Sequence, residues 1–333
     1  MRALPDAAVA RFRDDVERLV ARSDGASTST RGRRYALAVS GGPDSMAMLR
    51  LAAAALPDRI IVATVDHQLR HGSAAEVALV ADVCRRLDVP HEMLVPSAPI
   101  TGNSMQMRAR NARYAVLGEW MKREEASVLL TAHHADDQAE TLLMRLQRAS
   151  GLTGLAAIRA VRRDASGLVL RPLLEWRRAA LRAIVEDSAT PFVDDPSNDD
   201  PRHDRTQIRA LLAASPSLDP VALAASAGYL AEAEEVLVRY AGRMWEERWR
   251  GPEYGLAIAD EARDMRRRLV RRALDEARRR LGVVAPPFDA ESANVEPLLD
   301  ALEANRSATR AGILVRPTAQ GWIFHKAPPR RSL

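Results

Sequence analysis

The stretch Tyr35–Leu49 (YALAVSGGPDSMAML) contains the turn that decides the fold of the first half of the chain. Its first five residues form an apolar run typical of a buried strand, and the residues from Met46 onward continue as an apolar helix. Gly41, Gly42 and Pro43 lie between the two. A helix that starts directly after a strand offers unpaired N–H groups and a positive dipole end to an anion. The sequence therefore predicts a phosphate site at this turn.

The side chains of this loop differ from those of a Walker-type loop. Ser40 and Ser45 supply hydroxyl donors, and the glycines let an anion approach closely. A Walker loop would end in Lys-Ser or Lys-Thr, with its lysine on the terminal phosphates, whereas this loop has Asp44 and no lysine. Asp44 repels phosphate unless a cation lies between them, so we expect Mg²⁺ to bridge the two. The alternative is a tight turn that only caps a helix.

Length and composition indicate one large domain and a smaller one. The chain has 333 residues, of which 47% are hydrophobic and 28% charged, enough for a sizeable core. No apolar run approaches the ~20 residues of a membrane span, and the charged, amphipathic N-terminal segment differs from a signal peptide. We therefore expect a cytoplasmic protein without a membrane partner. The single cysteine, Cys84, cannot by itself form a disulfide, a CxxC pair or a cysteine-rich metal site.

Arginine dominates the basic residues. The formal net charge is +5, and lysine occurs only at Lys122 and Lys326. Arginine suits phosphate recognition because its planar fork donates two hydrogen bonds at once. The segment Glu261–Arg280 carries nine arginines and four acids on a helical pattern. Two interpretations stay open for it, a nucleic-acid-binding surface and a solvated helix face.

The first ~195 residues alternate predicted strands and helices, which favours an α/β fold with a doubly wound, mostly parallel sheet. After the opening turn, strands are expected at 59–67, 91–96 and 127–134, and helices at 73–87 and 105–124. Ligands of such sheets gather at the carboxyl ends of the strands. Three polar clusters follow strands in this way: SGGPDS, DHQLRHGSAAE and AHHADDQAET. We expect them to form one site.

The cluster AHHADDQAET combines two histidines with three acids. Asp136 and Asp137 precede Glu140 by four and three residues on the predicted helix, so these like charges are neighbours. Their repulsion predicts a cation among them: Mg²⁺, a ligand ammonium, or both. One alternative is that the first two acids only complement the helix N-terminus, which leaves Glu140 unexplained. Zinc is a weaker alternative, because the histidine spacing matches neither a zincin pair nor a cysteine-containing site.

Taken together, these clusters resemble the N-type ATP pyrophosphatases, the PP-loop superfamily. The segment NSMQMRARNARY adds to the likeness. Within the superfamily the chain is most similar to the tRNA(Ile)-lysidine synthetases, because PLLEWRRAALRAIV and the later DDPSNDDPRHDRTQIRALL resemble the extension of that family. The likeness covers the residues from Tyr35 to Leu212. Family members generally have Asn after the arginine that corresponds to Arg205, where this chain has Thr206.

The resemblance implies a two-step reaction on the cytidine at the first anticodon position of tRNA(Ile) with a CAU anticodon. ATP would adenylate the C2 carbonyl oxygen and release pyrophosphate. The ε-amino group of free L-lysine would then attack C2 and displace AMP, leaving lysidine. ATP and Mg²⁺ are the implied cofactors. The implied domains are the PP-loop catalytic domain with its helical extension over 1–212 and a smaller, helix-rich, basic domain contacting the tRNA over 213–333, with a homodimer as a further expected partner.

Residue roles are implied position by position. Asp44 and Asp137 would hold Mg²⁺, and Glu140 would receive or position the lysine ammonium. Arg205 would close over the site or contact the tRNA, as would Arg209 on the same helix face. The four catalytic residues implied are Asp44, Asp137, Glu140 and Arg205. The nucleotide-binding residues implied are Ser40, Gly41, Gly42, Pro43, Asp44, Ser45, Asp66, His67, Arg110, Arg113, His133 and His134. For the arginines and histidines, ordinary surface and core roles remain the alternatives.

Two other functions stay open. A sister enzyme of the superfamily thiolates tRNA bases, but that chemistry normally uses a cysteine pair or an iron–sulfur cluster, and Cys84 alone supplies neither. The second is a non-catalytic, nucleotide-regulated tRNA-binding protein. A silent site has no need of a costly cluster of negative charge, so the acids around Glu140 favour the enzyme.

Overall fold

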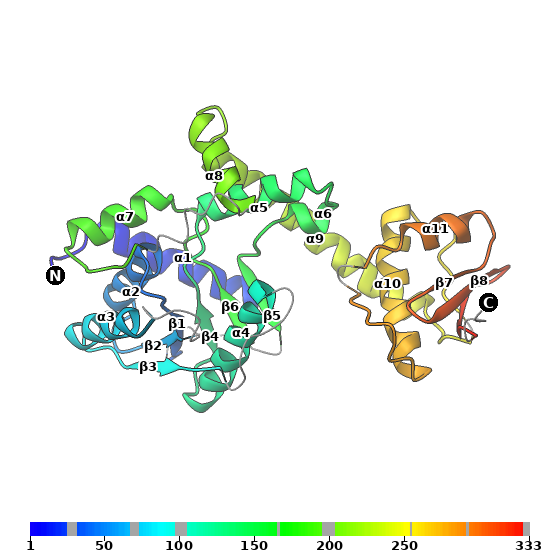
Figure 1. Cartoon of the computed structure of the whole chain (residues 1–333), viewed down its shortest axis with the longest axis horizontal. Coiled ribbons are helices and arrows are strands. Elements are labelled where there is room, and N and C mark those ends of the chain that lie inside the picture. Colours follow the sequence, from blue (N-terminus) through cyan, green and yellow to red (C-terminus); the bar gives the residue numbers. More distant parts are fainter. Residues whose placement is uncertain are drawn as a thin grey trace. The chain divides into compact units, whose positions relative to one another are not determined.

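The computed structural model describes residues 1–24, 32–66, 73–96, 105–164, 167–194, 204–253, 255–290 and 293–328 (Figure 1). Its contacts divide the chain into two compact units, Met1–Ala231 and Glu232–Leu333. This division falls within the long helix α9 (Pro220–Arg248). The predicted division into two functional domains at 212/213 stays a prediction. In the described part of the chain, no helix is both long enough and apolar enough to span a membrane.

The first unit is built on a six-stranded sheet in the order β3-β2-β1-β4-β6-β5. The strands are β1 (Tyr35–Ala38), β2 (Ile60–Val65), β3 (His91–Leu94), β4 (Val128–Leu130), β5 (Val161–Asp164) and β6 (Gly167–Leu170). All neighbours are parallel except β5 and β6. This confirms the predicted mostly parallel sheet. The β5–β6 pair was not predicted, because VRRD contains no apolar run that would mark a strand.

Helices cover both faces of this sheet, as predicted (Figure 1). One core cluster joins Leu37 of β1 to α1 (Asp6–Asp24), α2 (Pro43–Ala55), α3 (Ser73–Arg86) and α7 (Arg178–Asp187). A second cluster joins Ala36 to Leu117 and Trp120 of α4 (Met105–Arg123). Neighbouring residues of β1 thus face opposite sides, as the pleat of a strand requires. The fold is a doubly wound α/β sheet.

Cys84 lies in the first of these core clusters and is fully buried. Burial raises the pKa of its thiol to about 12, so the thiolate that reacts with disulfides is absent at neutral pH. We expect the native protein to be inert to Ellman's reagent and to react with one equivalent when unfolded in guanidinium. Rapid reaction of the native protein would contradict this burial and would reopen a thiol-based function.

The carboxyl edge of the sheet carries the loops of interest. β1 leads into the loop before α2, and β4 leads into the start of α5 (Ala135–Gln147). Because β1 and β4 are parallel neighbours, these two loops meet at the same edge of the sheet. α5 then packs against α6 (Leu152–Leu155) and α8 (Asp204–Ala214). The sheet order therefore brings together the predicted clusters SGGPDS and AHHADDQAET.

The second unit contains the end of α9, two further helices and a small antiparallel sheet, as expected for a smaller helix-rich domain. These elements are α10 (Arg263–Arg280), α11 (Glu296–Glu303), β7 (Ala308–Arg310), β8 (Ile313–Thr318) and β9 (Gly321–Lys326). Its own core includes Trp245, Leu269, Leu299 and Phe324. The unit therefore buries an apolar interior of its own.

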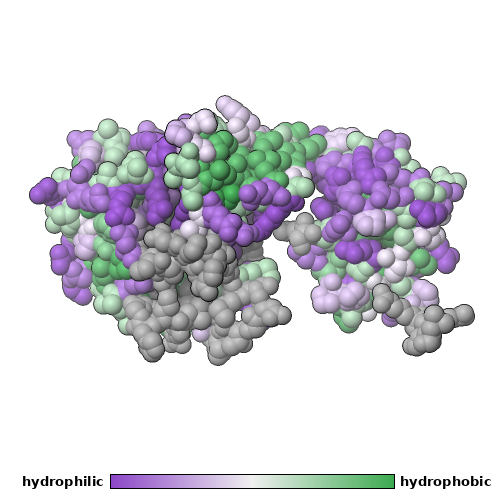
Figure 2. Space-filling view, turned by 45° about the horizontal axis from the view of Figure 1, so that its top comes forward, coloured by the Kyte–Doolittle hydropathy of each residue, from purple (hydrophilic) through white to green (hydrophobic). Residues whose placement is uncertain are grey.

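The arginines of α10 are largely paired with acids inside this second unit. Arg263 donates to Glu303 (2.6 Å), to Asp300 and to Glu296 (2.9 Å). Arg268 donates to Glu234 through both terminal nitrogens (2.6 and 2.8 Å). The visible surface of this unit is largely hydrophilic (Figure 2). The positive excess within 261–280 is thus offset by acids outside that segment, which a local charge count cannot detect.

Candidate active site

The loop between β1 and α2 has the geometry of an anion cradle. Gly41 has φ +87°, a left-handed conformation that favours glycine. Gly42 is the N-cap of α2 and Pro43 occupies its first turn, so no side chain caps the helix. Ser45 Oγ donates to the Gly42 carbonyl (2.9 Å) and accepts from the Ser40 N–H (3.2 Å). These bonds hold the loop in shape while the N-terminus of α2 stays open to an anion.

Asp44 has one buried oxygen with no partner among the described residues. Its Oδ2 lies 3.4 Å from His134 Nε2, whereas Oδ1 is buried without a hydrogen bond. Such an atom is costly unless a ligand completes it. A carboxylate oxygen is a preferred donor for Mg²⁺, which takes one or two protein carboxylates and completes its shell with phosphates and water. The absence of a described cluster of three metal-binding side chains is compatible with that pattern, and Asp44 fits the predicted cation.

His134 joins this loop to α5. It is the N-cap of α5 and forms a capping box with Asp137: its N–H donates to Asp137 Oδ2 (3.1 Å), and its Nδ1 accepts from the Asp137 N–H (3.3 Å). In the neutral ring the proton therefore lies on Nε2 and faces Asp44. Burial alone would lower the pKa of His134, but Asp44, Asp137 and Asp136 raise it above its ordinary value.

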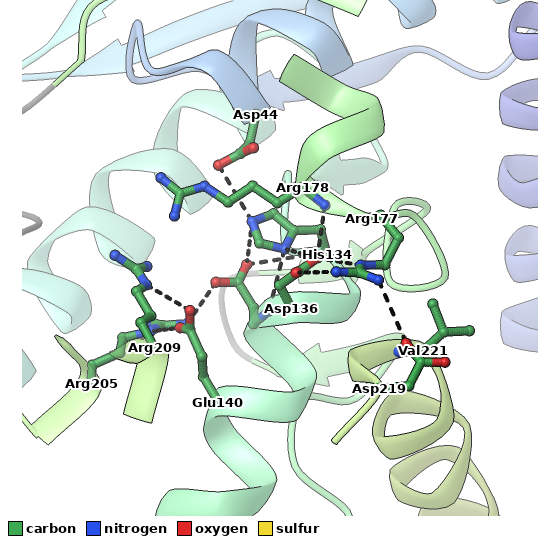
Figure 3. Close-up of polar contacts among 11 residues, drawn as sticks. Asp44, His134, Asp136, Glu140, Arg177, Arg178, Arg205, Arg209, Asp219 and Val221 are labelled. Carbon is green, nitrogen blue, oxygen red and sulfur yellow. Dashed lines mark hydrogen bonds and ion pairs between the residues drawn. The ribbon is translucent and has the colours of Figure 1, made fainter. Parts of the chain in front are cut away.

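Glu140 is a buried acid held by two arginines of α8 (Figure 3). Only 2% of it is exposed. Arg205 pairs with Glu140 through Nε and with Asp137 Oδ1 through Nη2 (2.6 Å), and Arg209 Nε lies 2.6 Å from Glu140 Oε1. The raised pKa of Asp137 has burial as its main cause, which Arg205 and His134 oppose. The cations beside these acids thus include side chains of the chain itself.

Asp136 has different partners from the other two acids of α5. Its Oδ2 accepts from the Arg178 N–H (2.7 Å), and Arg177 lies 3.3 Å from both of its oxygens. Arg177 Nη1 also lies 3.5 Å from Asp219 (Figure 3). No sequence pattern gave Arg177, Arg178 or Asp219 a role in the site, because their approach to α5 depends on the packing of α7 and the start of α9.

A second group of arginines surrounds Tyr114 of α4. The guanidinium carbons of Arg110, Arg113 and Arg162 lie 5.2, 5.8 and 4.1 Å from the centre of its ring. Burial alone would raise the pKa of Tyr114, but these arginines and Arg171 hold it below its ordinary value. Such a concentration of positive charge attracts phosphate. The sequence singled out Arg110 and Arg113 but not Arg162 or Arg171, which the order of β4, β6 and β5 brings to the same place.

Of the remaining predicted residues, the structure describes His133 and Asp66, whereas the others lie outside the described ranges. His133 lies close to the Tyr114 arginines: burial first, and then Arg171, Arg110, Arg113 and Arg205, hold its pKa well below the ordinary value. Its Nδ1 lies 3.1 Å from the Thr131 hydroxyl. Asp66 follows β2, where its N–H donates to the Leu94 carbonyl (2.8 Å). His67, Asn103 and the segment DPSND lie outside the described residues.

The sequence matches the PP-loop domain family over residues 12–215. The chain is 42% identical over 310 residues to a tRNA(Ile)-lysidine synthase of Novosphingobium aromaticivorans, with 90% of both chains covered. It is 37% identical over 305 residues to the tRNA(Ile)-lysidine synthase of Zymomonas mobilis, again with 90% of both covered. These matches confirm the predicted resemblance.

A solved structure supports the fold alone. The U34-tRNA thiolase NcsA from Methanococcus maripaludis, solved with its [4Fe-4S] cluster, aligns with a TM-score of 0.54 at 14% identity, covering 68% of this chain and 80% of that one. At 14% identity this likeness supports the fold and gives no information about function. From the PP-loop match and the two lysidine synthases we conclude that the chain belongs to the ATP-using PP-loop enzymes and, within them, to the tRNA(Ile)-lysidine synthase family.

Proposed function

We propose that this protein ligates free L-lysine to C2 of the first-anticodon-position cytidine of tRNA(Ile) with a CAU anticodon, using ATP. Family membership supports the reaction class. The observation that carries the site assignment is a chain of contacts: His134 joins Asp44 of the anion-binding loop to Asp137, and Arg205 joins Asp137 to Glu140. One part of this arrangement suits a nucleotide and the other suits an amine.

In the first step, the C2 carbonyl oxygen of the cytidine attacks the α-phosphorus of ATP and pyrophosphate leaves. The loop from Ser40 to Ser45 would hold the pyrophosphate at the start of α2, and Arg110 and Arg113 would meet the triphosphate. Mg²⁺ held by Asp44 and Asp137 would neutralise phosphate charge during the transfer. A loop without a Walker lysine suits cleavage between the α and β phosphates.

In the second step, the ε-amine of lysine attacks C2, a C–N bond forms, the amine loses a proton, and AMP leaves with its oxygen. Glu140 already accepts one bond at each oxygen from Arg205 and Arg209. A carboxylate has about four lone-pair sites, so Glu140 can accept a lysine ammonium without releasing either arginine. Arg205 also contacts Asp137, which connects the lysine side of the site to the metal side.

The wider assignments are also proposals. We assign tRNA contact to the second unit, but to exposed basic residues of its sheet, Arg310, Arg316 and Lys326, rather than to the paired arginines of α10. Phosphate binding by exposed cations breaks fewer ion pairs within the protein than binding by the paired arginines of α10 would. A cytoplasmic location and a homodimer remain part of the proposal, and a base thiolase or a silent tRNA-binding protein remains the alternative.

The deciding experiment is an incubation with Mg²⁺, ATP, radiolabelled lysine and the tRNA(Ile) transcript with a CAU anticodon. The control transcript has uridine in place of the target cytidine. We expect label on the first RNA alone, together with AMP, because the chemistry requires the cytidine C2 carbonyl. AMP formed only with a sulfur donor would identify a thiolase, and tRNA binding without AMP would identify the silent protein.

A further inference from the structure

A cavity of about 530 Å³ lies beside Glu140 and is lined by residues of α5, the start of α7, α8, the loop after α8 and the start of α9. Leu212, Pro216 and Leu218 form an apolar part of its lining, while Glu140 and Arg178 belong to the charged part. An apolar wall with a few convergent charged groups is typical of a small-molecule site. The cavity therefore suits a ligand with a hydrocarbon chain and charged ends.

Arg178 differs from the other arginines of this cavity. Arg177 is paired with Asp136 and Asp219, and Arg209 with Glu140. The backbone N–H of Arg178 donates to Asp136, but its guanidinium makes no hydrogen bond or ion pair with any residue that the structure describes. In the view of Figure 3 this side chain runs from the start of α7 across the site, between Asp44 and His134.

The two acids of α5 that line this cavity, Asp136 and Glu140, are already occupied. Both oxygens of Glu140 accept from arginines, and Asp136 accepts from Arg177 and from the backbone of α7. Arg178 also lowers the pKa of Asp194, but the main cause there is Arg182, which holds both Asp194 oxygens (2.8 and 3.1 Å). The cavity lacks an anion opposite the guanidinium fork of Arg178. Such a fork can bind a carboxylate through two parallel hydrogen bonds.

We propose that Arg178 binds the α-carboxylate of the amino-acid substrate in this cavity and so makes the enzyme select lysine over simple amines. This rests on the proposed function. The four methylenes of lysine pack on Leu212, Pro216 and Leu218, and Glu140 receives the ε-ammonium. The pocket thus recognises both charged ends of the substrate and the length between them. Arg178 is a specificity-determining residue of the second step and takes no part in adenylation.

The test uses cadaverine, which is lysine without its carboxylate. Three quantities are measured for the wild type and for Arg178→Met: the KM for lysine, the inhibition constant of cadaverine against lysine transfer, and lysine-independent pyrophosphate release with ATP and tRNA. We expect Arg178→Met to raise the lysine KM about 10- to 100-fold, which corresponds to the loss of a charge-assisted hydrogen bond. The inhibition constant of cadaverine and the rate of pyrophosphate release should stay unchanged. Arg178→Lys should give an intermediate KM, because it keeps the charge without the fork.

The control is Arg85→Met, an exposed arginine of α3 that pairs with Asp82 and lies outside the cavity lining, and it should leave all three quantities unchanged. Equal weakening of lysine and cadaverine by Arg178→Met would overturn the proposal, because the carboxylate would then not be the contact. Slower pyrophosphate release would overturn it in favour of a phosphate contact. A wild type that releases pyrophosphate but transfers no lysine would refute the proposed function itself, and a wild type that binds cadaverine as tightly as lysine would refute only the role of Arg178.

Discussion

Asp44→Asn is expected to lower adenylation about 10²- to 10³-fold while the protein keeps its fold. The change replaces a carboxylate by an amide of equal size and removes the negative charge next to the anion-binding loop. The buried Oδ1 of Asp44 has no partner in the described structure, so the fold loses no hydrogen bond there. The measurement is the rate of pyrophosphate release with ATP and tRNA, at several Mg²⁺ concentrations, beside a thermal melt.

The matched control for this variant is Asp82→Asn. Asp82 lies on α3 and pairs with Arg85 and Arg86 on the surface, where such pairs contribute roughly 0–1 kcal/mol. Its activity should equal that of the wild type. Normal turnover in Asp44→Asn, or a loss of activity matched by a loss of folded protein, would remove Asp44 from the mechanism.

Glu140→Gln is expected to slow lysine transfer about 10²-fold or more and to leave the rate of adenylation unchanged. Glutamine keeps the shape of the side chain but removes the charge that would attract the lysine ammonium. It also weakens the contacts with Arg205 and Arg209. Breaking a fully buried pair costs about 3–5 kcal/mol. For Glu140→Gln we expect the free energy of unfolding to fall by about 1–2 kcal/mol. Arg205 retains its contact with Asp137, and both arginines are partly exposed, so water replaces part of the lost interaction.

Single-turnover assays separate the two steps for this variant. Adenylated tRNA should accumulate in the absence of transfer, and added lysine should not discharge it at the wild-type rate. Glu175→Gln is the control, because Glu175 pairs with Arg18 on the exposed surface. Equal loss of both steps in Glu140→Gln would mean that Glu140 supports the whole site and does not select the amine.

The local sequence was enough to predict the parallel core of the fold. YALAV and SVLLT have the apolar runs of buried strands, and SGGPDS breaks the first run with residues that only a tight turn accommodates. These signals depend on residues within a few positions of one another, so they survive without tertiary information. The same holds for the placement of Asp44, Asp137 and Glu140 at strand and helix ends, since the carboxyl edge of a parallel sheet follows from strand direction.

Contacts between distant segments were beyond the reach of the sequence. The partner of a charged residue cannot be read from its neighbours in sequence: Arg268 and Arg263 of α10 pair with acids of α9 and α11, and Arg162 reaches Tyr114 through an edge strand that lacks an apolar run. Motifs identified the loop and the acids by themselves. Only the packing of α5, α7 and α8 decided that Arg177 and Arg209 are paired while Arg178 lines the cavity and its guanidinium has no hydrogen bond or ion pair in the described structure. Ion pairing depends on distances in space and not on spacing along the chain.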